Sequence, residues 1–400
     1  MKLFQHLLVA PAALGLLSPL AANATEVNLN EIANYSDIEN FEVSNSFDND
    51  KLTNSPLLVG GEGLVDSDSY DGSFSDTSTA SFSVKMAIGA VDGFGEKTTG
   101  TTNAEIEGDQ TVQFQYAFDT KIKTSFTGED SLVVAIDSGS TTAGPVDEYG
   151  LNNTSDQLKV DGVAYKFPVG ESITAMVADN QDGSSMFTTA CAYGGPSDTL
   201  DDCGNVNAAF DNGGFMTGAE YDFGNGWTAA VGYAGPETDI MSKEGADGYG
   251  ANVAYSADNY GVSVTYGNVD STKTVGTVTS PDGEKDAYTA FNAYYSFDNG
   301  VSVSGGYEFG DIGGAAATAD ESVNYFVGVS APAGPGELGA AFGTSGGQIE
   351  GQDEELMYEA YYSYPVNDGM TITPLVFVKE KAAAGVPDQT GVMVMSTFKF

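Results

Sequence analysis

The segment "GFMTGAEYDFGNGWTAAVGY", residues 214 to 233, decides the fold because it contains two alternating segments joined by a tight turn. Apolar or aromatic residues alternate with smaller and acidic ones, the period-two pattern of a β-strand. The outward set is Phe215, Ala219, Tyr221 and Phe223, and the inward set is Met216, Gly218, Glu220 and Asp222. Asn225 and Gly226 tolerate the positive φ that hairpins require. A soluble barrel would pack its large side chains inside, so we expect this apolar face to meet lipid.

The same pattern recurs to the end of the chain. Sixteen strands are predicted, near 81–91, 110–126, 131–138, 158–167, 170–178, 213–223, 227–235, 248–256, 260–267, 286–297, 300–309, 323–331, 335–343, 356–364, 369–378 and 389–400. Short turns alternate with long connections, which is typical of a membrane-spanning barrel with its short turns on the periplasmic side. The predicted fold is all-β: a transmembrane antiparallel β-barrel of about 16 strands. A cylinder of that width keeps a water-filled lumen.

The first 79 residues differ from the rest. Lys2, the apolar run 7–20 and Ala22-Asn23-Ala24 predict a cleaved signal peptide at 1–24, and hence export to the cell outer membrane. Residues 25–79 read as an acidic polar linker, and 80–400 as the barrel domain. The segment "DSDSYDG" departs from the calcium-loop motif, because Tyr70 stands at a ligand position, so we predict no metal.

The charge balance excludes several functions. The chain has 57 acidic residues against 14 basic ones, all of them lysine, and its one histidine, His6, lies in the predicted leader. The mature chain would therefore lack Ser-His triads, histidine zinc sites and arginine clamps for anions. Its acidity repels nucleic acid. We predict neither an enzyme nor a cofactor. An exported structural or adhesive β-protein without a pore remains the alternative, and it would pack its apolar faces inside.

The longest connection, 179–212, holds both cysteines. An oxidising periplasm favours a Cys191–Cys203 disulfide, and the closed loop would carry Asp198, Asp201 and Asp202. The sequence leaves two placements open. The disulfide either staples an external loop, or the loop folds into the lumen and narrows it. The predicted architecture includes this third extracellular loop inserted in the lumen, with the three aspartates as its acidic constriction.

Strand parity assigns lumen-facing charges. The predicted basic ones are Lys85, Lys121, Lys123 and Lys166, and the predicted acidic ones are Glu220, Glu308 and Glu359. If the third loop brings carboxylates opposite the lysines, a transverse field crosses the pore and orients dipolar solutes. The alternative is that the lysines are ordinary lumen residues. The excess of acid argues against anion selectivity.

The final segment "VMVMSTFKF", residues 392 to 400, alternates to its last aromatic residue. Pairing of this strand with 81–91 would close the barrel and leave no unpaired edge in lipid. Val392, Val394, Phe398 and Phe400 would then face lipid.

The chain resembles cyanobacterial outer-membrane porins of the carbohydrate-selective porin family. The resemblance is carried by the leader, by "FDTKIKTSFTGEDSL" at 118–132, "YKFPVGESIT" at 165–174, "ACAYGGPSD" at 190–198 and "YDFGNGWTAAVGYAG" at 221–235, and by the terminal Phe400. It implies a homotrimer in outer-membrane lipid that passes small hydrophilic solutes, such as ions or carbohydrates. It also implies that Phe400 is a signal for the barrel assembly machinery. At 34–41 the chain lacks the Trp and Thr-Arg-x-Glu signature of an S-layer-homology domain, so peptidoglycan attachment is not predicted.

Overall fold

The computed structural model describes residues 78–93, 112–140, 148–151, 154–210, 213–238, 240–241, 246–270, 274–275, 278–279, 285–313, 320–346, 348–349, 351–382 and 386–400. The chain divides into two units, Met1–Glu62 and Gly63–Phe400, and all described residues belong to the second. The predicted signal peptide and almost all of the predicted linker lie outside the described residues. No helix in the described ranges is long and apolar enough to cross a membrane.

The described residues form sixteen long strands and three short ones. The long strands are β1 (Ser78–Asp92), β2 (Gln113–Thr124), β3 (Ser131–Gly139), β4 (Lys159–Val169), β5 (Ile173–Asp179), β6 (Phe215–Gly224), β7 (Trp227–Gly235), β8 (Gly248–Ser256), β9 (Tyr260–Asp270), β12 (Lys285–Ser296), β13 (Ser302–Asp311), β14 (Glu321–Ala333), β15 (Gly336–Thr344), β17 (Leu356–Asn367), β18 (Met370–Lys379) and β19 (Gln389–Lys399). The two-residue strands β10 (Thr274–Val275), β11 (Val278–Thr279) and β16 (Gln348–Ile349) lie in long connections. All sixteen predicted strands are confirmed, with no boundary off by more than three residues.

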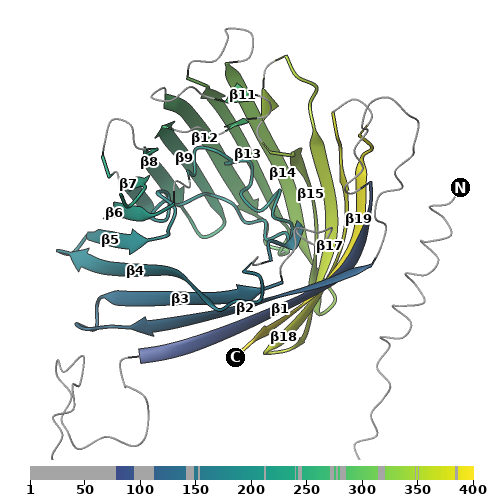
Figure 1. Cartoon of the computed structure of the whole chain (residues 1–400), viewed down its shortest axis with the longest axis horizontal. Helices are drawn as coiled ribbons and strands as arrows, with labels where there is room; N and C mark the ends of the chain where they lie inside the picture. Colours follow the sequence, from purple (N-terminus) through teal and green to yellow (C-terminus); the bar gives the residue numbers. More distant parts are fainter. Residues whose placement is uncertain are drawn as a thin grey trace, which may run out of the picture. The chain divides into compact units, whose positions relative to one another are not determined.

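Each long strand pairs antiparallel with its neighbours in sequence, and the ring closes between the first and last strands (Figure 1). The closing register runs from Ser83 opposite Lys399 to Asp92 opposite Thr390. Beyond it, Phe82 and Phe400 exchange two backbone hydrogen bonds of 2.9 and 3.1 Å. The predicted seam is therefore confirmed, and closure satisfies the backbone groups that an open edge would expose to lipid.

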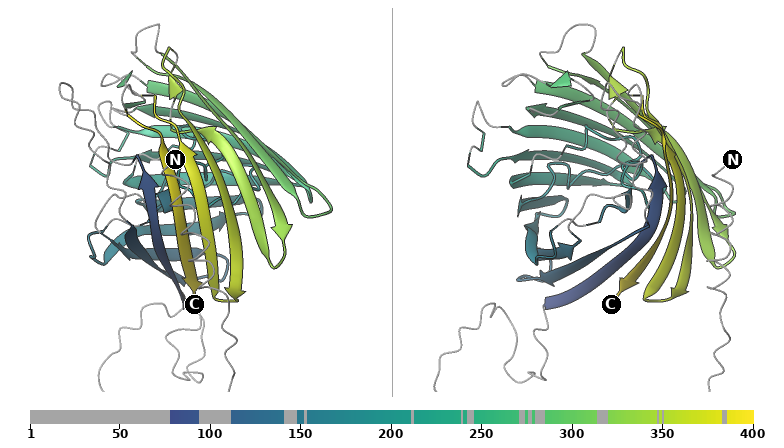
Figure 2. Two further views of the ribbon diagram at one scale, coloured as in Figure 1. Left: turned by 90° about the vertical axis from the view of Figure 1, so that its right-hand side faces the viewer. Right: turned by 45° about the vertical axis from the view of Figure 1, so that its right-hand side comes forward.

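The two rims differ in loop length (Figure 2). At the first rim the connections are short, at 125–130, 170–172, 225–226, 257–259, 297–301, 334–335 and 368–369. At the other rim they are long, at 93–112, 140–158, 180–214, 236–247, 271–284, 312–320, 345–355 and 380–388. The 225–226 turn shows why the short ones close: Asn225 and Gly226 adopt φ values of 53° and 84°. This asymmetry is the one predicted for a membrane-spanning barrel.

The barrel wall is apolar outside and more polar inside. On β13, Val303, Tyr307 and Phe309 are exposed, whereas the alternating Ser304 and Glu308 are buried. Aromatic pairs lie at the short-turn rim, where an interfacial girdle belongs. They are Tyr221–Phe223, Trp227–Tyr255 and Tyr295–Phe297, with ring centroids 4.6, 5.0 and 4.8 Å apart. The orientation of the hairpin at 214–233 is therefore as the sequence predicted.

Candidate functional site: the constriction inside the barrel

The third long connection, residues 180–214 and called L3 below, lies inside the barrel. Its backbone N–H groups at Thr188, Ala190 and Ala192 donate to inward-facing side chains of the wall. The acceptors are Asn252 Oδ1 on β8, Ser263 Oγ on β9 and Ser304 Oγ on β13, at 3.0, 2.9 and 2.8 Å. This stretch of L3 thus crosses the inner wall from β8 to β13 and bonds to β8, β9 and β13. Of the two placements left open by the sequence, the structure has the lumenal one.

Apolar side chains of L3 pack against the inner wall in two clusters. In the first, Met186, Phe187 and Phe210 contact residues of β5, β6, β7 and β9. In the second, Tyr193 and Leu200 pack with Phe326 and other residues of β14 to β19. Phe210 and Phe326 expose 0% and 1% of their surface, so these contacts exclude water. Burial of this kind stabilises L3 against the wall.

Glycine on the inner wall allows the loop to come close. A Cβ atom at Gly232 or Gly306 would collide with the backbone oxygen of Gly183 or Cys203, respectively. Both glycines lie on the lumen face, directly beneath L3. The missing side chain therefore makes room for the loop backbone.

The Cys191–Cys203 disulfide is formed, with its Cα atoms 6.4 Å apart. Cys203 is 1% exposed, and its carbonyl oxygen accepts a 2.9 Å hydrogen bond from Asn292 Nδ2 on β12. The disulfide closes the tip of L3 that carries Asp198 and Asp201. The predicted disulfide is thus present, and the loop that it closes lies inside the lumen and not outside the barrel.

A second loop also enters the barrel, which the sequence analysis did not anticipate. Tyr149 is 3% exposed and donates its hydroxyl to the Thr373 carbonyl of β18 at 2.9 Å. Glu148 accepts from L3 twice, through its carbonyl from Asp198 N–H at 2.8 Å and through its carboxylate from Thr199 Oγ1. Lys379 on β18 binds that carboxylate at 3.2 Å. The sequence feature that could have indicated this insertion is the apolar pair Tyr149 and Leu151, which lies in a connection otherwise rich in polar residues.

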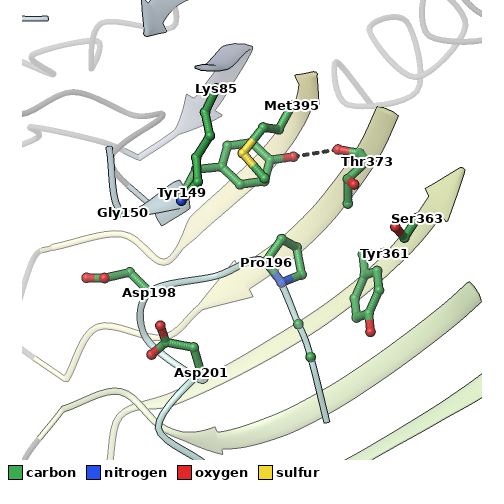
Figure 3. A pocket seen from close by; sticks show the side chains of 12 residues that line it. Lys85, Tyr149, Gly150, Pro196, Asp198, Asp201, Tyr361, Ser363, Thr373 and Met395 are labelled. Carbon is green, nitrogen blue, oxygen red and sulfur yellow. Dashed lines mark hydrogen bonds between the residues drawn. The ribbon is translucent and has the colours of Figure 1, made fainter. Parts of the chain in front are cut away.

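The two loops border a cavity of about 330 Å³ with strands β1, β17, β18 and β19 (Figure 3). Its lining residues are Lys85, Tyr149, Gly150, Gly194, Gly195, Pro196, Asp198, Asp201, Tyr361, Ser363, Thr373 and Met395. Lys85 thus borders the same space as two of the three predicted loop carboxylates. Ser363, Thr373 and Tyr361 lie on the opposite side of the cavity (Figure 3), and the Tyr361 hydroxyl donates to Glu337 at 2.8 Å. The cavity therefore offers both signs of charge and several hydrogen-bonding groups to a solute.

Partial burial alters the acidity of the loop carboxyls. Desolvation, followed by repulsion from Glu148, raises the pKa of Asp198, and Lys379 and Lys85 oppose that rise. Desolvation and the charge of Asp198 raise the pKa of Asp201 to about 6. Burial likewise raises the pKa of Asp202 to about 7. Asp202 is not among the residues that line the cavity, and it accepts a 3.0 Å hydrogen bond from Gly204 N–H.

The other predicted basic residues lie at different levels of the lumen. Lys85 pairs with Ala117, whereas Lys121 and Lys123 are four and six residues further along β2, about 13 and 20 Å toward the short-turn rim. Lys166, on β4, pairs with Ser131 at the start of β3, also near that rim. The four lysines therefore do not form one wall at the level of L3.

The predicted acidic residues fall into two groups. Glu220 on β6 is half-buried on the lumen face. Glu308 and Glu359, predicted as pore-lining, are instead covered by L3 and expose 0% and 5% of their surface. Tyr193 of L3 donates its hydroxyl to Glu359 at 2.5 Å. Strand parity placed both on the inner face, but it could not show that a loop covers them.

Comparisons with known proteins agree on the fold. No family model and no curated protein sequence matches the chain. The high-pH structure of Pseudomonas putida OprB matches with a TM-score of 0.57 and 10% identity, covering 81% of this chain and 94% of that one. The anion-selective porin from Comamonas acidovorans matches with a TM-score of 0.56 and 15% identity, covering 81% and 99%. A triple mutant of the Rhodopseudomonas blastica porin matches with a TM-score of 0.51 and 14% identity, covering 81% and 100%. The chain thus shares the closed barrel of bacterial porins.

Proposed function

We propose that this chain forms an outer-membrane channel for passive diffusion of small hydrophilic solutes. The observation that carries the proposal is a closed sixteen-strand barrel whose apolar face points outward and whose lumen is narrowed by L3. A lumen of this width is too large for side chains alone to fill. The porins that share the fold support the same conclusion.

The alternative, a structural or adhesive surface protein without a pore, requires the apolar faces to be packed inside. Val231 and Val253 expose 58% and 46% of their surface on the outer face. The inner face has buried polar residues instead, such as Asn252 and Ser263. This distribution favours a lipid-facing wall. The porins that share this fold favour a channel over an enzyme.

The finer proposals concern solutes. The cavity of about 330 Å³ lies at the lower end of the range for small-molecule sites. Its hydroxyl groups suit ions with their hydration water or small carbohydrates, in line with the resemblance to carbohydrate-selective porins. The chain's excess of acidic residues favours cations over anions.

We also propose an exported homotrimer in outer-membrane lipid. The exposed Phe400, whose ring stacks on Phe82 at 5.6 Å, would be the aromatic signal that the assembly machinery binds. Chemical crosslinking in detergent tests the trimer. A monomer at every protein concentration would contradict it.

Single-channel recording in planar bilayers tests the function. The folded protein, identified by heat-modifiable migration on gels, should give stepwise ion conductance. Sugars small enough to enter the channel should reduce the current, and larger sugars should not. The size at which the reduction stops gives the aperture. Folded protein that never conducts would overturn the proposal.

A further inference from the structure

Glu308 is a carboxylate on the inner wall with none of its surface exposed. It extends from β13 and lies beneath L3. Burial of an ionised side chain is costly unless donors surround it. Its surroundings therefore determine what it does.

Four hydrogen bonds reach the Glu308 carboxylate, each 2.8 Å long. Oε2 accepts from the backbone N–H groups of Asn207 and Ala208. Oε1 accepts from Nδ2 of Asn207 and from Nδ2 of Asn324 on the neighbouring strand β14. Two carboxylate oxygens have about four acceptor positions, so all of them are used. Three of the four donors belong to L3.

We propose that Glu308 is a positioning residue: its carboxylate fixes the returning arm of L3, residues 205–208, and thereby sets the aperture of the channel proposed above. Bonds to a charged acceptor are about twice as strong as neutral ones. Two consecutive backbone N–H groups aimed at one oxygen also fix the direction of the arm. Solutes do not meet this charge, because L3 covers it.

The surroundings of the arm agree with this role. Ala208 is 0% exposed and contacts the backbone of Gly267, where a Cβ atom would clash with its carbonyl oxygen. Asn292, on the adjacent strand β12, donates a hydrogen bond to the Cys203 carbonyl oxygen. Because the arm packs tightly against the wall on both sides, a small displacement of the arm at Glu308 also moves Cys203 and the tip of L3.

The test uses substitutions that change the charge and hydrogen bonding of a side chain but keep its size. Asn207→Asp keeps the size of the loop residue but places a carboxylate against Glu308. Repulsion should release the arm without altering the barrel wall. Glu308→Gln in the same chain restores a complementary pair, because the glutamine amide can donate to the new aspartate. It can also donate to Asn324 Oδ1 once the Asn324 amide turns over and donates to Thr344 Oγ1 instead of accepting from it. The double variant should therefore recover what the single variant loses.

Reduction of the Cys191–Cys203 disulfide reports the position of the loop. A water-soluble phosphine reduces the disulfide in the intact, detergent-solubilised protein, and maleimide mass-tagging follows the free thiols. Asn207→Asp should speed reduction on the order of tenfold, the effect of losing a charge-assisted bond. The double variant should return most of the way to the wild-type rate. Glu220→Gln, which also removes one lumenal carboxylate, should leave the rate unchanged.

Single-channel recording gives the second measurement. Asn207→Asp should raise the conductance and its fluctuations, and the double variant should lower both again. An unchanged reduction rate in Asn207→Asp that still migrates as a folded barrel overturns the proposal. Failure of Glu308→Gln to rescue overturns it as well. Because reduction needs no ion flow, a wild-type protein that never conducts would reject the channel but leave this result standing.

Discussion

The inner wall of the barrel has two regions with the same alternating pattern but different roles. The covered wall, on β8 to β14, has Asn252, Ser263, Ser304 and Glu308, and L3 lies on it. The open wall, on β1 to β4, has Lys85, Lys121, Lys123 and Lys166 on its lumen face. Polar groups of the covered wall bind the loop backbone, whereas those of the open wall can meet solutes. An inward-facing residue is therefore part of the pore surface only where no loop covers it.

The largest expected effect comes from separating L3 from the covered wall. Gly306→Ala places a Cβ atom where the Cys203 carbonyl oxygen lies, so the loop must move away. We expect a severalfold rise in single-channel conductance with the barrel intact. The matched control is Gly305→Ala on the same strand, because a Cβ atom there meets only the Phe326 oxygen at 3.7 Å. Equal conductance in the two variants would contradict the close fit of L3.

The second prediction concerns the open wall and compares two lysines. Lys85→Glu reverses a charge that borders the cavity with Asp198 and Asp201, so cation selectivity should rise. Lys123→Glu makes the same change about 20 Å away along the strand, roughly two Debye lengths at 0.1 M salt. Its shift in reversal potential should be on the order of fivefold smaller. Equal shifts would show that the level of L3 does not control selectivity.

The sequence predicted the barrel well because the alternation of apolar and polar residues within each strand reflects the surroundings of that strand's two faces. Alternation in segments such as 300–309 reports which face meets lipid, and turn residues such as Asn225 report where a hairpin closes. It predicted the site less well, because contacts of L3 join residues far apart in the chain. Lys379 and Glu148, for example, are brought together only by the fold. The loop's covering of Glu308 likewise leaves no local signal in strand β13.

The third prediction is a dependence of selectivity on pH. Burial raises the pKa of Asp201 to about 6 and that of Asp202 to about 7, so both take up protons as pH falls from 8 to 5. The constriction then loses negative charge, and cation selectivity should decline over that range. Their pKa values in the folded chain exceed the ordinary aspartate value near 4, so the folded loop is stabilised as pH falls through them. Reversal potentials at several pH values measure the change.

Two variants show which carboxyl matters for that pH dependence. Asp201→Asn should remove most of it, because Asp201 lines the cavity. Asp202→Asn should remove less, since that side chain is turned to Gly204 and lies outside the lining. The reverse order would mean that Asp202, and not Asp201, is exposed to passing ions.

The smallest expected effect concerns the clasp between the two inserted loops. Lys379 binds the Glu148 carboxylate at 3.2 Å and Thr199 Oγ1 at 2.8 Å, and so joins the second loop to L3. Lys379→Met removes these bonds but leaves the Tyr149 hydroxyl on Thr373 and the buried ring in place. Mean conductance should therefore stay close to the wild-type value while current fluctuations increase. Lys381→Met is the matched control, because Lys381 lies 3.8 Å from Glu355 and has no described bond to either inserted loop. Fluctuations that increase equally in both variants would show that loss of a lysine, and not release of the clasp, causes them.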